Sequence, residues 1–307
     1  MWTTHRDYAE EIGDFRRLAR LLTDDPEHVR RHTTWPIGRL VDWKYGMWGA
    51  KPSIPRFCER NAHLWLDALG ELAAVAISEE GGTQIAVLTT RGHRFLFEEA
   101  LAWAVAAWGE RGPLSVEITE WAEVEAAALA RRGFVRASIF HSYAFDLTEP
   151  LPEPPPLEAG FALVDMQSHP DYRARRVLRA EAFQGRAGLS DEDLDRDLDL
   201  EAAWRHSPTY HPAADVYVLA PDGRLVAGCE ALIDTRNAEA DVERVCTHSA
   251  FRRRGFARAA IYACLLRLRD LGMTRAAIAG YSPEALGLYG SLGAGAHQTC
   301  LVYRQEA

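Results

Sequence analysis

Apolar residues change their spacing within the stretch from Asp241 to Leu271. Residues Val242 to Thr247 are rich in β-branched and small side chains, which is typical of a strand. After Phe256 the apolar positions follow helical spacing: Ala257, Ala260, Ile261, Cys264, Leu265, Leu268 and Leu271. Gly272 then provides a stop signal. This pattern predicts a strand, a turn and a helix in direct succession.

The turn between that strand and that helix is basic and contains a glycine. It consists of Arg252, Arg253, Arg254, Gly255, Phe256, Ala257 and Arg258. Gly255 has no Cβ and Ala257 is small, so backbone N–H groups can approach a ligand closely. These groups lie at a helix N-terminus, where the helix dipole and the arginines favour a diphosphate. The turn lacks the Gly-Lys-Ser/Thr of a P-loop and the Gly-x-Gly-x-x-Gly dinucleotide pattern. A cluster of solvated arginines is the alternative.

The first half of the chain also alternates between strand and helix patterns. Helical spacing predicts helices over residues 8–22, 95–108 and 122–132. Strand patterns occur over residues 63–78, with a break at Leu69-Gly70, and over 84–90, 115–118 and 134–147. The aromatic cluster of Trp35, Trp43, Tyr45 and Trp48 is interpreted as core rather than as a box for a cation. This order of elements indicates an α/β domain.

A proline-rich segment separates two similar halves. Residues 149–160 contain five prolines, which exclude a helix interior or a central strand, so residues 150–160 are predicted to be a linker between domains 1–149 and 161–307. Similar local patterns recur 153 to 164 residues apart, for example Asp7-Tyr8 and Asp171-Tyr172, or Gly133 and Gly293. The spacing predicts a tandem repeat of one fold.

The second half has clearer strand signals. Strands are predicted over residues 217–219, 225–233 and 241–247, as antiparallel neighbours, and over 275–279, parallel to the third. Ser282-Pro283-Glu284 has the chemistry of a helix start, with a hydroxyl cap, a proline and an acid in the first turn.

Length, charge and cysteine content exclude several classes of protein. At 307 residues the chain exceeds a usual single core, and its formal net charge of -9 argues against nucleic acid as the main partner. The sequence has no long apolar run and no basic, apolar N-terminal segment, so neither a membrane span nor a signal peptide is expected. Five cysteines without a Cys-x-x-Cys pair are expected to be buried free thiols in the cytoplasm, with no metal site.

Residues 189–201 form an acidic run, with seven acids and one arginine. We interpret the run as a solvated face. The alternative is a surface that attracts a polyamine, an aminoglycoside or a basic peptide terminus.

The motif Arg252-x-x-Gly255-x-Ala257 resembles the Arg/Gln-x-x-Gly-x-Gly/Ala signature of the GNAT superfamily of N-acetyltransferases. Ser282-Pro283-Glu284-Ala285 and Leu288-Tyr289-x-x-x-Gly293 follow in the family's usual order and spacing, so the resemblance covers residues 215–302. It implies an α/β (α+β) fold of two tandem GNAT-like domains, each a mixed, mostly antiparallel twisted sheet flanked by helices. The cofactor that it implies is acetyl-CoA, a coenzyme A thioester.

The resemblance also implies the residues of the cofactor site. In the family two parallel strands part and the pantetheine arm pairs with the backbone of the first. The predicted cofactor-binding residues are Val245, Cys246, Thr247, Arg252, Arg253, Arg254, Gly255, Phe256, Ala257, Arg258 and Ser282. The family often has Asn at the position of Ser282 and Phe at that of Ala294.

Three residues are predicted to be catalytic. Tyr289 matches the tyrosine that protonates the departing thiolate in many family members, and its alternative role is packing. Asp241 and Glu243 are two residues apart on one strand and share a face, so either can accept the proton of the amine. Glu243 is favoured because it is longer and nearer the reactive end. Either acid can instead bind the amine or pair with Arg244 or Arg252.

The first half lacks the corresponding chemistry. Its turn, Thr90-Arg91-Gly92-His93-Arg94, is too short and too poor in Gly and Ala to bind a diphosphate, and Leu129 corresponds to Tyr289. We therefore expect a degenerate, non-catalytic domain, although Arg91, Gly92 and His93 can still contact an anion.

The sequence predicts an acetyl-CoA-dependent N-acetyltransferase that acts on a primary amine of a small molecule or peptide, by direct attack in a ternary complex. The alternatives are a non-catalytic acyl-CoA-binding module and a tandem acetyltransferase similar to mycothiol synthase. A monomer with two similar domains, or a homodimer, is expected, with no membrane or nucleic-acid partner.

Overall fold

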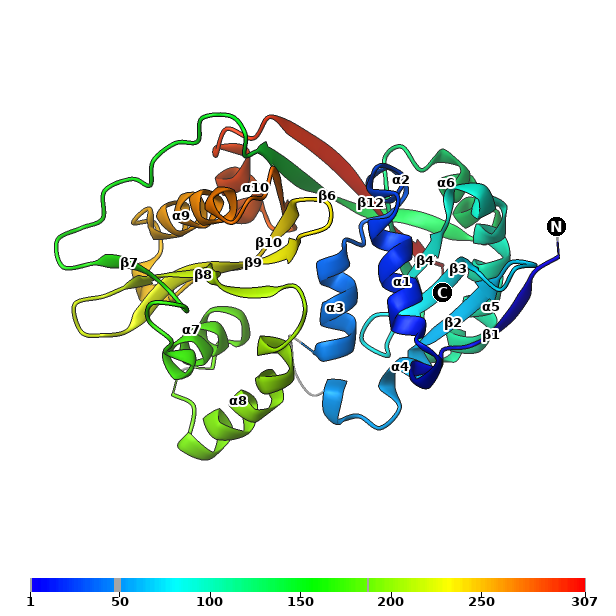
Figure 1. The fold of residues 1–307 in the computed structure, drawn as a ribbon, viewed down its shortest axis with the longest axis horizontal. Coiled ribbons are helices and arrows are strands. Elements are labelled where there is room, and N and C mark those ends of the chain that lie inside the picture. The colour runs from blue at the N-terminus through cyan, green and yellow to red at the C-terminus, as the bar shows by residue number, and fades with distance from the viewer. Residues whose placement is uncertain (1, 47–50, 187, 307) are drawn as a thin grey trace. The chain divides into compact units, whose positions relative to one another are not determined.

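The computed structural model describes residues 2–46, 51–186 and 188–306, which divide into two compact units (Figure 1). Unit 1 comprises Met1–His141 and Gln298–Ala307, and unit 2 comprises Ser142–His297. Each unit has a mixed, mostly antiparallel sheet with helices packed on it, which confirms the predicted fold class.

Unit 1 begins with short helices and then alternates strands with helices. Its helices are α1 (Asp14–Thr23), α2 (Pro26–His32), α3 (Ile37–Tyr45), α4 (Phe57–Asn61), α5 (Phe97–Trp108) and α6 (Glu123–Arg131). Its strands are β1 (Thr4–Asp7), β2 (Ala62–Leu66), β3 (Leu72–Ser78), β4 (Gln84–Thr89), β5 (Ser115–Thr119), the first part of β6 (Phe134–Asp146) and most of β12 (Ala296–Gln305). The strand order is β1-β2-β3-β4-β5-β12-β6, and β4 and β5 are parallel.

Unit 2 has a similar succession of elements. Its helices are α7 (Tyr172–Gln184), α8 (Asp191–Arg205), α9 (Phe256–Asp270) and α10 (Pro283–Gly290). Its strands are β7 (Ala162–Asp165), β8 (Tyr210–Leu219), β9 (Leu225–Asp234), β10 (Glu239–Thr247), β11 (Arg275–Gly280) and the end of β6. The two units differ in that α7 and α8 lie between the first two strands of unit 2, where unit 1 has α1 to α4. The order is β6-β11-β10-β9-β8-β7, with β10 and β11 parallel. The repeated order confirms the tandem prediction.

Both faces of each sheet are covered, which explains the continuous apolar runs in the central strands. In unit 1 all seven residues of β3 are buried, with Ala73, Ala74 and Ala76 in the core toward α5 and Leu72, Val75 and Ile77 in the core toward the N-terminal helices. In unit 2 the larger core lies between the sheet and α9, and a smaller one lies between the sheet and α7. Trp35 and Trp43 belong to the core of unit 1, as predicted, whereas Trp48 lies outside the described residues.

The division of the chain differs from the predicted one. Residues 142–146 of β6 belong to unit 2, and residues 298–305 of β12 belong to unit 1. Each sheet therefore takes one strand from the other half of the chain. An alternating strand pattern shows which face is buried but not which sheet the strand joins.

The proline-rich segment lies within unit 2 rather than between two domains. Leu151 and Leu157 pack against the larger core of that unit, and Glu158 forms an ion pair with Arg254. Prolines exclude regular structure here, but they do not prevent the neighbouring side chains from packing.

We predict that removing residues 298–307 will destabilise unit 1 selectively. Residues 300–304 pair with β5, and Cys300 is 3% exposed, so the deletion would uncover an edge strand and part of a core. Hydrogen exchange should show lost protection in β5 and retained protection in β8 and β9. Equal loss in both units would contradict the observed division.

Candidate functional site

The parallel strands β10 and β11 separate before they end. They pair over only four positions, from Glu239 with Arg275 to Val242 with Ile278, whereas β10 continues to Thr247. Past Val242, backbone groups on this side of β10 have no partner in β11. The gap is the one that the resemblance implied, and it is a place where an extended ligand can add its own hydrogen bonds.

Strand β10 contains a β-bulge at the same point. Glu243 pairs with Glu230 and Cys246 pairs with Gly228, so Arg244 and Val245 together lie opposite one residue of β9. Arg244 has a φ of 53°, in the left-handed region. The bulge changes which side chains face which layer: Val242 packs in the core beside α9, but Cys246 packs in the core beside α7. Burial raises the pKa of the Cys246 thiol to about 12, so this side chain packs, as expected.

The basic turn has the conformation that a helix N-terminal anion site needs. Gly255, with φ 81°, is the N-cap of α9, and no side chain caps the helix. The first N–H groups of the helix therefore keep their orientation toward a ligand. Arg253 also has a positive φ, of 65°. The donor set of backbone amides and guanidinium groups fits a diphosphate.

The arginines of this turn differ in their contacts. Arg254 donates to Glu158 at 2.8 Å and lies 4.8 Å from the ring of Phe256, so much of its charge is neutralised within the protein. Arg258 donates to the hydroxyl of Ser291 at 2.7 Å, and Arg252 donates to the carbonyl of Thr247 at 3.4 Å. Arg252 and Arg253 are exposed. Nothing in the sequence distinguished the four arginines, because Glu158, the partner of Arg254, lies 96 residues away in the chain.

Asp241 and Glu243 lie on the face of β10 that α7 and α8 cover. Their register partners on β9 are Leu232 and Glu230, and Glu230 contacts arginines of α7. Burial, together with the charge of Glu243, raises the pKa of Asp241 to about 8. A carboxylate with such a pKa is a stronger base than an exposed one. Glu243 itself is exposed. The sequence favours Glu243 over Asp241 as the base. In the structure, however, the pKa of Asp241 is raised.

Tyr289 and Ser282 lie on the helix that follows β11. The hydroxyl of Ser282 accepts the N–H of Ala285 at 3.2 Å, so it caps α10 as predicted. The ring of Tyr289 is 7% exposed and packs beside Gly280, where an added Cβ would lie 3.0 Å from the ring. Burial raises the pKa of Tyr289, and nearby Cys229 and Glu243 add to the effect. The ring belongs to the same buried core as Val242 and Cys229.

In unit 1 the corresponding gap is closed by α2. Strands β4 and β5 pair only over Gln84 with Ser115 and Ile85 with Val116. Beyond these pairs, a ring nitrogen of His28 lies 2.8 Å from the carbonyl oxygen of Thr89, and the hydroxyl of Thr119 donates to the carbonyl of Arg31. Both contacts join α2 to the ends of the parting strands.

The arginines of the corresponding turn in unit 1 are already paired. Arg91 donates to Asp25 at 2.7 and 3.0 Å, and Arg94 donates to Glu125 at 3.0 and 2.7 Å. Burial opposes ionisation of Glu125, but the nearby His32 ring, 3.6 Å away, and the hydrogen bonds from Arg94 lower its pKa to about 2. Because these arginines already have carboxylate partners, an anion is less expected at Arg91, Gly92 and His93.

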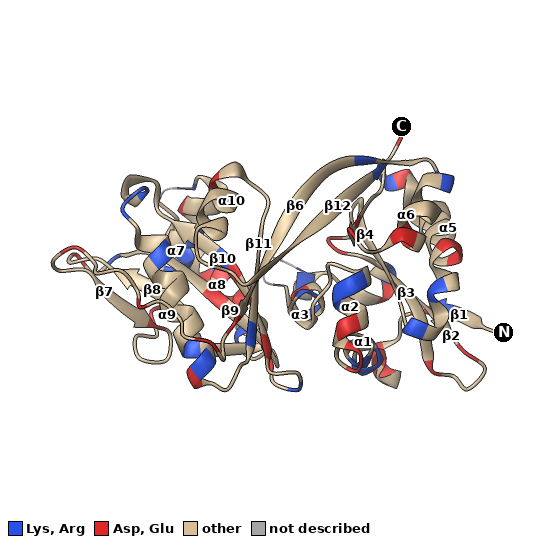
Figure 2. Cartoon of the chain, turned by 90° about the horizontal axis from the view of Figure 1, so that it is seen from above, with Lys and Arg blue, Asp and Glu red and all other residues tan. Residues whose placement is uncertain are grey.

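The acidic run combines exposed acids with ion pairs to neighbouring arginines. Five of its seven acids form ion pairs with arginines of α7, of α8 or of the segment between them: Asp191, Asp193, Asp195, Asp197 and Glu201. Arginines are concentrated on α7 and acids on α8 (Figure 2). The interpretation as a solvated face holds for Asp191, Glu192, Asp195 and Asp199, which are exposed, whereas Glu201 is buried and pairs with Arg175 of α7.

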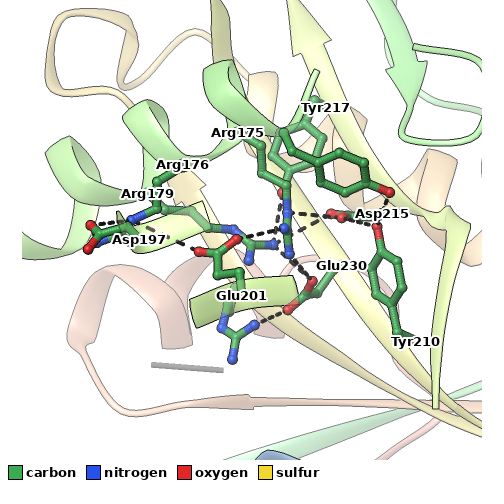
Figure 3. A network of polar contacts seen from close by, with 11 residues as sticks. Arg175, Arg176, Arg179, Asp197, Glu201, Tyr210, Asp215, Tyr217 and Glu230 are labelled. Carbon is green, nitrogen blue, oxygen red and sulfur yellow. Dashed lines mark hydrogen bonds and ion pairs between the residues drawn. The ribbon is translucent and has the colours of Figure 1, made fainter. Parts of the chain in front are cut away.

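A buried charge network beneath these helices was not predicted at all (Figure 3). Arg175 contacts Glu201, Asp215 and Glu230, each at 3.0 Å. Arg179 contacts Glu230 at 2.9 Å, and Arg244 pairs with the other oxygen of Glu230. Hydrophobicity patterns cannot reveal such a network, because each charge is buried only together with its partners.

All five cysteines are free thiols. Within residues 2–46, 51–186 and 188–306, no cluster of three or more His, Cys, Asp or Glu side chains is suited to a metal ion. None of the helices described combines the length and apolar character of a membrane span.

Residues 174–294 match the model of the acetyltransferase (GNAT) family. No curated protein sequence matches the chain. Among solved structures, a GCN5-related N-acetyltransferase from Sphaerobacter thermophilus is 18% identical with a TM-score of 0.63, covering 99% of this chain and 95% of its own. A tandem GNAT protein from the clavulanic acid biosynthesis pathway, solved without AcCoA, is 14% identical with a TM-score of 0.67, covering 99% and 98%. A putative acetyltransferase from Pyrococcus horikoshii is 12% identical with a TM-score of 0.53, covering 99% and 89%.

We predict that Asp241→Asn will stabilise the protein at alkaline pH. The carboxyl has a pKa of about 8 in the folded state against 3.8 as an ordinary value, so between these values the folded state binds more protons than the unfolded state. Stability therefore falls as pH rises through this window. The substitution removes that loss and should raise the free energy of unfolding at pH 8 by on the order of 1 kcal/mol or more, with no gain near pH 4.

Urea unfolding across this pH range measures the effect. Asp222→Asn is the control, because Arg224 lowers the pKa of Asp222 and its removal should bring no alkaline gain. The prediction is contradicted if the free energy of unfolding differs between wild type and Asp241→Asn by the same amount at acid and at alkaline pH.

Proposed function

We propose, from the match of residues 174–294 to the acetyltransferase (GNAT) family, that the chain is an acetyl-CoA-dependent N-acetyltransferase whose reaction takes place in unit 2. The likeness to the tandem GNAT structure extends over both units, which share that fold. One observation carries the proposal: the gap between β10 and β11 begins on the strand that leads directly into the uncapped N-terminus of α9.

The residues on this path suit a coenzyme A thioester. We propose that the amides after Gly255, with Arg252 and Arg253, hold the diphosphate, and that the backbone of Val245 to Thr247 forms hydrogen bonds with an extended pantetheine arm. The thioester supplies an activated acetyl group and a thiolate leaving group. At the bulge, the N–H of Val245 is the proposed donor to the carbonyl oxygen, where negative charge develops.

The acids on the other side of the bulge suit the incoming amine. An amine must lose its proton to attack, and Asp241 or Glu243 is the proposed acceptor, directly or through water. With a pKa near 8, Asp241 is partly ionised at neutral to alkaline pH and holds the proton well once it accepts it. Binding the amine and the thioester together supplies much of the rate by proximity.

Tyr289 completes the proposed proton transfers. As the carbon–sulfur bond breaks and the amide bond forms, the phenol donates its proton to sulfur. The transfer leaves a phenolate, which burial disfavours. The proton that the amine gives to Asp241 or Glu243 is therefore proposed to return to the phenolate, directly or through water.

Unit 1 is proposed to be non-catalytic. Helix α2 closes its gap, the arginines of its turn are paired, and Leu129 corresponds to Tyr289. An acceptor screen with purified protein and acetyl-CoA, read by mass spectrometry, tests the proposal. Acetylation of a primary amine supports it. Coenzyme A binding with no turnover across small amines, polyamines and peptides would favour a non-catalytic acyl-CoA-binding module.

We predict that Gly255→Val will weaken coenzyme A binding by about tenfold or more. A β-branched residue is strained at φ 81°, and its side chain would project where the amides meet the diphosphate. Gly272→Val is a matched control: Gly272 lies at the other end of α9 with φ 86°, and at both positions an added Cβ meets no atom within 4 Å. Calorimetry should show normal affinity for the control. Equal affinities for the two variants would show that the diphosphate does not bind at this turn.

We predict that Tyr289→Phe will lower kcat by about 10- to 100-fold while leaving the affinity for acetyl-CoA unchanged, because it removes only the proton donor. Tyr262→Phe is the matched control, since Tyr262 is equally buried in unit 2 and donates to the carbonyl of Leu292 at 3.3 Å. Steady-state rates with an acceptor from the screen measure both variants. If the two variants have equal kcat values, Tyr289 contributes only packing and is not the proton donor.

A further inference from the structure

Arg244 occupies a backbone conformation that its side chain does not favour. Its φ of 53° is in the left-handed region, which only glycine adopts freely. It is also part of the bulge, with Val245 beside it and Cys229 opposite. Strained residues of this kind persist only where surrounding contacts hold them.

Arg244 is held by the buried charge network around Glu230, whose contacts with Arg175 and Arg179 are shown in Figure 3. Its guanidinium group is 1% exposed and pairs with Oε1 of Glu230, whose own side chain is fully buried. The other oxygen of Glu230 contacts Arg175 at 3.0 Å and Arg179 at 2.9 Å. The ring of Trp204 lies 5.4 Å from the guanidinium carbon. Glu230 is therefore fixed from α7, and Arg244 is fixed through Glu230.

We infer that Arg244 is a positioning residue: its ion pair with Glu230 holds the bulge of β10, and the bulge directs the amide of Val245 and the carboxylate of Glu243. This inference rests on the proposed function, because it concerns the same reaction site. Arg244 touches neither substrate in this scheme and acts only through the backbone.

The geometry explains why the effect is specific to this position. Glu243 and Glu230 are direct partners across the strands, so the strand is in regular register immediately before the bulge. Losing the extra residue would shift the register from Arg244 onward by one. A one-residue shift turns each following side chain to the other face, and it would move the amide of Val245 away from the gap.

The test uses bound acetyl-CoA and needs no acceptor. In wild-type protein the carbonyl stretch of carbon-13-labelled acetyl-CoA should fall in frequency on binding, because a backbone donor polarises it. Arg244→Lys keeps the positive charge but loses the two-pronged geometry, and it should reduce that shift by about half or more. Affinity for coenzyme A itself, which lacks the acetyl group, should stay within about threefold.

Two further variants separate positioning from general stability. Glu230→Gln weakens the same ion pair from β9 and should reduce the carbonyl shift in the same way, and the double variant should add little. Arg224→Lys is the control, because Arg224 also pairs with a carboxylate, Asp222 at 2.7 Å, but in an exposed turn. Its carbonyl shift should equal that of wild type. Thermal unfolding establishes that each variant is folded before the spectra are compared.

The outcomes distinguish this inference from the proposed function. If wild-type protein binds no acetyl-CoA, the proposed function fails. If acetyl-CoA binds and the carbonyl shift is the same in wild type and in folded Arg244→Lys and Glu230→Gln, the role of Arg244 is overturned while the proposed function stands.

Discussion

The separation of two parallel strands is the constraint on which both units depend. A strand that loses its neighbour leaves backbone N–H and C=O groups that need other partners. Unit 1 supplies partners from its own chain, since α2 reaches the carbonyl of Thr89 and the hydroxyl of Thr119. In unit 2, β10 runs on past Val242 toward the uncapped start of α9. The same fold thus closes the gap in one copy and presents binding groups in the other.

Charge in unit 2 is organised around the strand that carries the candidate site. The acids of α8 meet the arginines of α7, and the arginines of α7 meet Asp215 and Glu230 in the sheet. Breaking one member of such a network leaves a buried charge without its partner, which is far more costly than losing a surface ion pair. The helices over the face of Asp241 and Glu243 are therefore held by contacts that also define the shape of β10.

Much of unit 2 could be predicted from local sequence. The strand and helix on either side of Gly255, the cap at Ser282 and the packed side chain of Cys246 follow from residues within a few positions of one another. The bulge at Arg244 could not be predicted, because the partner that holds it, Glu230, lies on another strand. The exchange of β6 and β12 was missed for a similar reason: pairing partners are chosen between distant segments. The carboxylate of Asp241 could be identified as a candidate base from the sequence, but the burial that raises its pKa could not be predicted.

The exchanged strands have a consequence for the order in which the protein can form. Strand β12 lies more than 170 residues after β5, its neighbour in the sheet of unit 1. During synthesis on a ribosome, the intervening residues take roughly ten to thirty seconds to emerge. Until then β5 has an open edge, which is a hazard for pairing with other chains. Unit 1 is the first to be made, yet its sheet is completed only after all of unit 2 has been translated.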